Sequence, residues 1–194
     1  MQVDFVLPGG KLYVPDAEKI IPKIDSLVES CRQGRVFLVS STDAHKLADQ
    51  EFRDWPPHCL KGTPGAELIP EACAPNRFII PNEPGVSLPA ELSSYNQLVI
   101  EKNSLDIFDN PNTDAVLASL NPNAEFAVFG VATEYCVALT IEGLLRRGKR
   151  VAIVTDAVQP MDAAKGGALL DDFRSRGVRL LNAEQALSLL PSAA

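Results

Sequence analysis

Short apolar runs alternate with amphipathic stretches over most of the chain. The run Arg35–Ser40 is almost continuously apolar, which is typical of a strand buried on both faces of a parallel sheet. Between Ile20 and Cys31, apolar residues recur at the spacing of one helix face. On these two patterns we predict strands at 35–40, 97–102, 125–131, 151–155 and 178–181, and helices at 15–31, 114–120, 133–148, 161–176 and 183–190.

Strands that alternate with helices indicate right-handed crossover connections and a parallel sheet with helices on both faces. We therefore expect an α/β fold with three layers (α/β/α), a mostly parallel sheet and one domain over residues 1–194. In such folds ligands bind beyond the carboxyl ends of the strands. Ser41–His45, Lys102 and Cys136 follow three different predicted strands, so we expect them to meet there.

Residues 43–96 break the regular alternation. The segment is rich in proline, glycine, asparagine and charged residues, and only Phe78–Ile80 resembles a strand. A loop this long in a compact domain is usually functional and contains small elements of its own. We therefore expect it to be a metal- and substrate-binding region.

The composition limits the kinds of partner that we expect this protein to bind. The formal charge of -7 argues against a nucleic-acid or acidic-membrane surface. The four cysteines form no C-x-x-C pair, and neither a signal-peptide pattern nor a long apolar span is present. We therefore expect a cytoplasmic protein with no nucleic-acid or membrane partner.

The stretch Gly130–Val137 reads as a strand that ends in a sharp turn and leads Cys136 into the first turn of a helix. Thr133 is suited to cap that helix, with Glu134 just inside it. Backbone N–H groups at a helix start lower the pKa of a thiol and can bind an oxyanion. A nucleophilic cysteine is thus one interpretation, and a buried structural cysteine fits this stretch equally well.

Both histidines lie in the irregular segment. Asp43 and His45 at a strand end, with His58 across a short loop, can form three ligands of a metal site, and Glu51 can supply a fourth. Oxygen and imidazole donors without a thiolate suit Zn²⁺, Fe²⁺ or Mn²⁺. Surface histidines in a polar loop are the alternative.

Two further features are ambiguous. Lys102 closes a buried strand, where its charge could stabilise a thiolate, or its side chain could simply extend to solvent. Trp55, with Phe5 and Tyr135, could form an aromatic slot for a flat ring or could belong to the core.

Six motifs together resemble the isochorismatase-like cysteine hydrolases, and within them the nicotinamidase and pyrazinamidase group. The resemblance covers nearly the whole chain. Its motifs are Asp4-Phe5 with Pro8-Gly9-Gly10, Asp43-x-His45, Trp55-Pro56-Pro57-His58-Cys59, Gly62-Thr63-Pro64-Gly65-Ala66-Glu67, Lys102, and Gly130–Val137.

The resemblance implies an amidohydrolase that converts nicotinamide to nicotinate and ammonia, as in NAD salvage. Cys136 would be the nucleophile and Lys102 its charged partner, and a cis Val131–Ala132 peptide is implied. An oxyanion hole would be formed by the N–H groups of Ala132 and Cys136. A divalent metal, zinc first and iron or manganese next, would bind Asp43, His45 and His58, with Glu51 as a further ligand. The ring pocket would comprise Phe5, Trp55, Val131, Ala132 and Tyr135, and such domains often form homo-oligomers.

Two departures qualify the expected activity. Members of this family carry a first strand that ends in Asp-x-Gln, whose aspartate shuttles protons, whereas this sequence starts at Met1-Gln2. We therefore expect either that an N-terminal segment is missing from the sequence or that the strand is lost and turnover is slow. Residues 103–111 also differ from the usual nicotinamidase sequence. The alternatives are thus a hydrolase of another small amide or carbamoyl compound, or a catalytically impaired small-molecule binder.

Overall fold

Six parallel strands form the framework of this computed structural model, which describes residues 1–191. They are β1 (Leu38–Asp43), β2 (Arg77–Ile80), β3 (Gln97–Lys102), β4 (Glu125–Val131), β5 (Arg150–Gln159) and β6 (Arg179–Leu181). All paired strands are parallel, which confirms the α/β class predicted from the alternating pattern. The strands are divided between two three-stranded sheets, with the orders β1-β3-β2 and β4-β5-β6.

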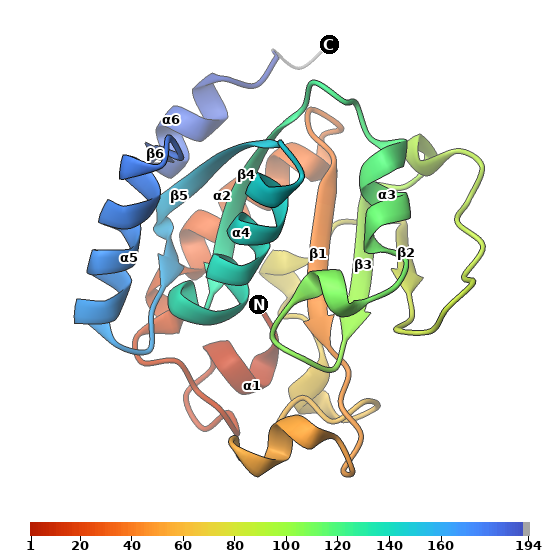
Figure 1. Cartoon of the computed structure of the whole chain (residues 1–194), viewed down its shortest axis with the longest axis vertical. Coiled ribbons are helices and arrows are strands. Elements are labelled where there is room, and N and C mark those ends of the chain that lie inside the picture. The colour runs from red at the N-terminus through yellow and green to blue at the C-terminus, as the bar shows by residue number, and fades with distance from the viewer. Residues whose placement is uncertain (192–194) are drawn as a thin grey trace.

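Helices cover both faces of the second sheet. The helices are α1 (Val3–Val6), α2 (Ile21–Arg32), α3 (Thr113–Ser119), α4 (Ala138–Arg146), α5 (Ala163–Ser175) and α6 (Ala183–Ser188). Val154 of β5 packs into a core with α2 and α6, whereas its neighbour Ile153 packs into a second core with α4 and α5. Successive strand residues point to opposite faces, so β5 lies in the middle of three layers (Figure 1). Within residues 1–191 we find no helix with the length and hydropathy that a membrane span needs.

The inner edges of the two sheets lie on either side of an apolar cavity. Within residues 1–191, β1 pairs only with β3 and β4 pairs only with β5. The cavity has a volume of about 560 Å³ and is lined by Leu38–Ser41 of β1, by residues 125–131 of β4 and by side chains of α2. Met1, Lys102 and Cys136 line it as well. The single sheet that we expected is thus split in two, because no described strand pairs with both inner edges.

Two predicted strands are displaced or extended relative to the structure. The first strand was predicted at 35–40 but spans Leu38–Asp43, because all six of these residues pair in register with Gln97–Lys102. The fourth was predicted at 151–155, and β5 continues to Gln159 because its later residues pair with the end of β4. Both differences bring polar residues to the carboxyl ends of strands.

The irregular segment contains short 3₁₀ turns at Gln50–Arg53, Pro64–Ala66, Pro70–Ala72 and Leu92–Ser94, besides β2. The side-chain amide of Gln2 links this irregular segment to the sheet by hydrogen bonds. The Nε2 of Gln2 donates to the carbonyls of Asp43 (2.7 Å) and Ala66 (2.8 Å), and its Oε1 accepts from the Asp43 N–H (2.8 Å). The segment therefore lies against the carboxyl ends of β1 and β3, which point toward it in Figure 1.

Candidate active site

Lys102 and Asp43 form a buried ion pair at the ends of adjacent strands. The parallel register of β1 and β3 makes these two residues the last cross-strand pair. The Lys102 ammonium contacts Asp43 Oδ1, donates to the Ser104 carbonyl at 2.8 Å and lies 3.5 Å from Cys136 Sγ. Only 2% of Lys102 is exposed, so its side chain does not extend to solvent. The ends of β1 and β3 thus place the Lys102 ammonium beside the Cys136 thiol.

The pKa values of the pair favour the charged forms. Burial alone would raise the pKa of Asp43, but the charge and hydrogen bond of Lys102 together with the two nearby histidines outweigh it, and the pKa falls to about 2. Burial would lower the pKa of Lys102, whereas Asp43 and Cys136 raise it above its usual value. The pair is therefore ionised at neutral pH.

Cys136 lies in a π-helical turn (Thr133–Val137) between the cis Val131–Ala132 peptide and α4. The expected cis peptide is confirmed, but the expected Thr133 cap is wrong. Ala132 occupies the N-cap position, and the Thr133 hydroxyl is buried without a hydrogen-bond partner. Burial raises the pKa of Cys136, and Lys102 opposes this without reversing it. The lowered thiol pKa that we predicted is therefore wrong, because desolvation outweighs the stabilising charge of Lys102.

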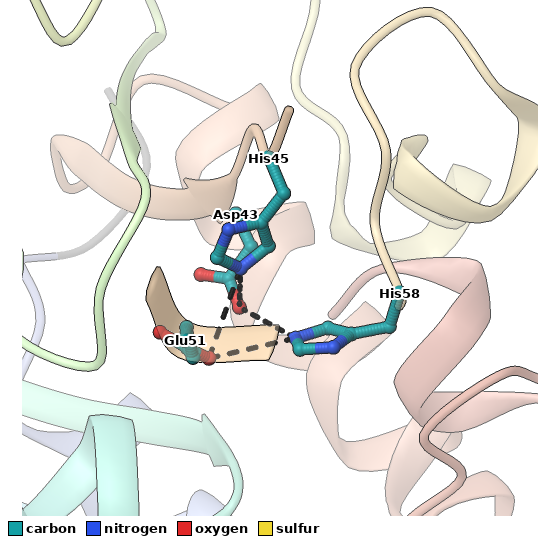
Figure 2. A group of neighbouring side chains, drawn as sticks. All are labelled: Asp43, His45, Glu51 and His58. Atoms are coloured by element: carbon teal, nitrogen blue, oxygen red, sulfur yellow. Dashed lines mark ion pairs between the residues drawn. The ribbon is translucent and has the colours of Figure 1, made fainter. Parts of the chain in front are cut away.

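Figure 2 shows the four predicted metal-binding residues converging on one point. One ligand atom from each of Asp43, His45, Glu51 and His58 lies within 4.8 Å of the others. Both histidine Nε2 atoms are 3.7 Å from Glu51 Oε1, and they are 3.7 Å (His58) and 3.9 Å (His45) from Asp43 Oδ2. Ligand atoms around a tetrahedral zinc ion are about 3.3–3.4 Å apart, given bonds of about 2.0–2.1 Å. A small contraction of the cluster would fit a divalent cation.

Hydrogen bonds turn both imidazoles so that Nε2 faces the cluster. His45 Nδ1 lies 3.1 Å from Asp49 Oδ2, and His58 Nδ1 lies 2.8 Å from the Pro56 carbonyl. These acceptors favour a proton on each Nδ1, which leaves a lone pair on each Nε2. Both Nε2 atoms and Asp43 Oδ2 are buried without a hydrogen-bond partner. Burial and the nearby Asp43 also raise the pKa of Glu51, as concentrated negative charge does. Unpartnered buried acceptors of this kind suit a cation.

An apolar pocket adjoins the cluster and the cysteine. Trp55 and Tyr135 pack edge to face with ring centroids 5.1 Å apart, and Phe5 packs on His58 at 5.2 Å. These aromatic residues line a cavity of about 20 Å³ together with Val131, Ala132, Cys136, Asp43, Glu51 and His58. The structure thus brings together the residues predicted for nucleophile, metal and ring.

Several neighbours of the site were not predicted. Leu12, Val14, Leu105 and Met161 also line the pocket. Asp49 orients His45, and Glu134 accepts backbone N–H groups of the loop that carries Met161. Only Asp49 had a sequence signal, as a carboxylate four residues after a candidate ligand. The others meet the pocket through tertiary contacts alone.

Replacing Asp49 by alanine should weaken zinc binding by about 10- to 100-fold, because His45 would lose the acceptor that orients it. Competition against a chromogenic chelator would measure the affinity. Asp54→Ala is the matched control, since Asp54 is exposed in the same segment and its side chain makes no hydrogen bond among the described residues. Equal affinities for Asp49→Ala and the control would contradict the orienting role.

Comparisons with known proteins agree on one family. A family model described as the isochorismatase domain matches residues 1–81 and 73–185. The nicotinamidase of Escherichia coli is 25% identical over 191 residues, covering 84% of this chain and 84% of that protein. The nicotinamidase/pyrazinamidase of Mycobacterium tuberculosis is 26% identical and covers 93% and 94%.

Solved structures share the fold over nearly the full length. An isochorismatase-like hydrolase from Alkaliphilus metalliredigens has a TM-score of 0.77 and 26% identity, covering 97% of this chain and 93% of that one. A pyrazinamidase of Pyrococcus horikoshii in complex with zinc has a TM-score of 0.74 and 29% identity, covering 94% of each chain. The architecture described above is therefore shared with proteins of this family.

Proposed function

The chain belongs to the isochorismatase family, and from that premise we propose that it is a metal-containing amidohydrolase of the nicotinamidase type. The reaction would convert nicotinamide and water to nicotinate and ammonia. One observation carries the proposal: a single apolar pocket adjoins both the Cys136 thiol with its Lys102–Asp43 pair and the cluster around His45 and His58. Nicotinamidases of E. coli and M. tuberculosis are among its relatives.

In the first half of the reaction, Cys136 Sγ bonds to the carboxamide carbon of the substrate. The thiol proton passes to the amide nitrogen, the C–N bond breaks and ammonia leaves, so that a thioester remains. Lys102, held by Asp43, stabilises the sulfur anion as it forms. N–H groups of Ala132 and Cys136 would bind the carbonyl oxygen as it becomes negative.

In the second half, water attacks the thioester carbonyl and the C–S bond breaks. The products are the free carboxylic acid and the Cys136 thiol, so the enzyme returns to its starting state. The aromatic pair Trp55–Tyr135 and the ring of Phe5 would hold the substrate ring flat and exclude other water.

Asp43, His45, Glu51 and His58 would hold the metal, and zinc suits this set of two carboxylates and two imidazoles. When bound, a divalent cation supplies a Lewis-acid centre that can position the ring nitrogen of the substrate. The Pyrococcus pyrazinamidase, whose structure contains zinc, supports the same choice, with iron and manganese as alternatives.

Two other functions remain as alternatives. A carbamoyl compound that carries a carboxylate would find neither arginine nor lysine among the described residues that line the pocket, which favours an uncharged ring amide. A catalytically impaired binder is favoured by one observation. Among residues 1–191, Cys136 Sγ contacts Lys102 but forms no hydrogen bond with a carboxylate. Proton transfer by such a group contributes roughly 10²- to 10⁴-fold to many enzymes.

Ammonia release, measured with and without chelation, tests the proposal. Zinc-loaded protein should release ammonia from nicotinamide and pyrazinamide but not from a carbamoyl amino acid. Thorough chelation should abolish release and lower the melting temperature, because a bound metal stabilises the folded state by about 2.7 kcal/mol at a concentration of 100 Kd. Full activity with an unchanged melting temperature after chelation would exclude the metal. Nicotinamide binding without ammonia release would favour the binder.

A further inference from the structure

We propose that Met161 is the specificity-determining wall of the substrate pocket and that Glu134 is the positioning residue that holds it. This inference rests on the proposed function, because it concerns the same pocket. Met161 follows β5, just before α5 begins, and lines the cavity together with Tyr135 and Cys136. It is half-buried and packs on the core cluster beside Tyr135.

The backbone at Met161 is held directly by the turn that carries the nucleophile. Glu134 Oε2 accepts the Met161 N–H at 3.1 Å, and Glu134 Oε1 accepts the Asp162 N–H at 2.8 Å. Hydrogen bonds to an ionised carboxylate are stronger than those between neutral groups. Since Glu134 lies two residues before Cys136, this pair of bonds fixes the pocket wall relative to the thiol.

Two contacts hold the same segment from its other side. Asp162 Oδ1 caps α5 by accepting the N–H groups of Ala164 (2.9 Å) and Lys165 (3.2 Å). Pro160 packs so closely on α5 that a Cβ at Gly166 would come within 2.6 Å of the proline ring. The Met161 main chain is therefore fixed at both neighbours, and only its side chain is free to adjust.

A ring that binds on the side of Cys136 facing Trp55 and His58 requires such an adjustment. A volume of about 20 Å³ accommodates roughly one water molecule, and a six-membered ring is much larger. Trp55 and Tyr135 already pack against each other, and Phe5 packs on His58. Among the described residues that line the pocket, Met161 is the only long unbranched apolar side chain. Methionine has three rotatable bonds and adapts to irregular spaces. Its displacement would admit the ring, and its bulk would limit substituents on the ring.

Steady-state kinetics on Met161→Ala, Met161→Ile and Glu134→Gln would test this proposal. The substrates are nicotinamide and its 5-methyl and 6-methyl derivatives. Met161→Ala should improve kcat/KM for at least one methylated substrate by about tenfold relative to nicotinamide, the usual worth of space for one methyl group. Met161→Ile should raise KM for nicotinamide several-fold with kcat nearly unchanged, because a β-branched side chain cannot swing aside.

Glu134→Gln should also raise KM more than it lowers kcat. A glutamine amide keeps one acceptor oxygen, but its NH₂ group would face the second backbone N–H, so one of the two bonds is lost. Glu142→Gln is the matched control, since Glu142 is a glutamate of α4 that pairs with Arg176 outside the pocket. The control should keep both constants of the unaltered protein.

Unchanged size preference in Met161→Ala, or equal KM values for Glu134→Gln and Glu142→Gln, would overturn the inference while the proposed function stands. If the unaltered protein released no ammonia from any amide, the proposed function would fail separately. Calorimetric binding of nicotinate and 6-methylnicotinate would then decide. Tighter binding of the methylated ring by Met161→Ala, relative to nicotinate, would support the inference, and an unchanged ratio or no binding by any variant would overturn it.

Discussion

Replacing Cys136 by alanine should reduce ammonia release from nicotinamide by on the order of 10⁴-fold or more, because removing a nucleophile eliminates the covalent route. The change leaves Lys102, the four side chains around His45 and His58, and the aromatic pocket in place. Calorimetry should therefore still detect nicotinate binding by the variant. Folding should be little affected, since Cys136 is half-buried and alanine is smaller.

Cys73→Ala is the matched control for this change. Cys73 is also a free, half-buried cysteine, but it lies outside the pocket, beside Arg77. The control should keep the turnover of the unaltered protein. Comparable activity in Cys136→Ala and Cys73→Ala would refute the thioester scheme.

Replacing Lys102 by methionine should lower the free energy of unfolding by about 3–5 kcal/mol, because removing one partner leaves the Asp43 charge buried and unpaired. Turnover should fall by about 10²- to 10³-fold, since the charge that stabilises the sulfur anion is lost. Denaturant unfolding and ammonia release would measure the two effects.

Two further variants identify the source of the instability. Lys61→Met breaks the ion pair with Glu101, in which the lysine side chain is 54% exposed, and should cost no more than about 1 kcal/mol. The double variant Lys102→Met with Asp43→Asn, compared in the presence of chelator, should recover much of the stability. The single variant Asp43→Asn completes the comparison. If the double variant lost as much free energy of unfolding as Lys102→Met and Asp43→Asn lose in sum, the ion-pair explanation would be contradicted.

The strands that carry the site were predictable where a local apolar run marks them. Gln97–Lys102 and Glu125–Val131 were predicted with the observed boundaries, because each is an apolar run between turn-forming residues. The convergence of Asp43, Lys102 and Cys136 was predictable for a related reason. Parallel strands bring their carboxyl ends to one edge, whatever lies between them in sequence.

Features that depend on partners distant in sequence were not predictable in this way. Leu38–Asp43 is a strand because β3 pairs with it, although Ser40–Thr42 interrupt the apolar run. The thiol pKa is governed by burial, which a helix-start argument does not include. Met161 lies at the pocket through tertiary contacts, among them its backbone bond to Glu134. In each case the residues that interact show no sequence pattern that would indicate their contact.

The two carboxylate oxygens of Asp43 contact different neighbours. Cation binding at the histidines and ionisation of the Cys136 thiol therefore depend on each other. Oδ1 contacts Lys102, which approaches Cys136, whereas Oδ2 faces the histidines of the cluster. A cation bound at Oδ2 would interact with the same negative charge that Lys102 neutralises. Asp43 would then compensate less of the Lys102 charge, and the ammonium would stabilise the Cys136 thiolate more strongly. Thermodynamic linkage is reciprocal. Loss of the Cys136 proton would therefore strengthen cation binding by the same factor by which the cation favours that loss, and Asp43 would transmit both effects.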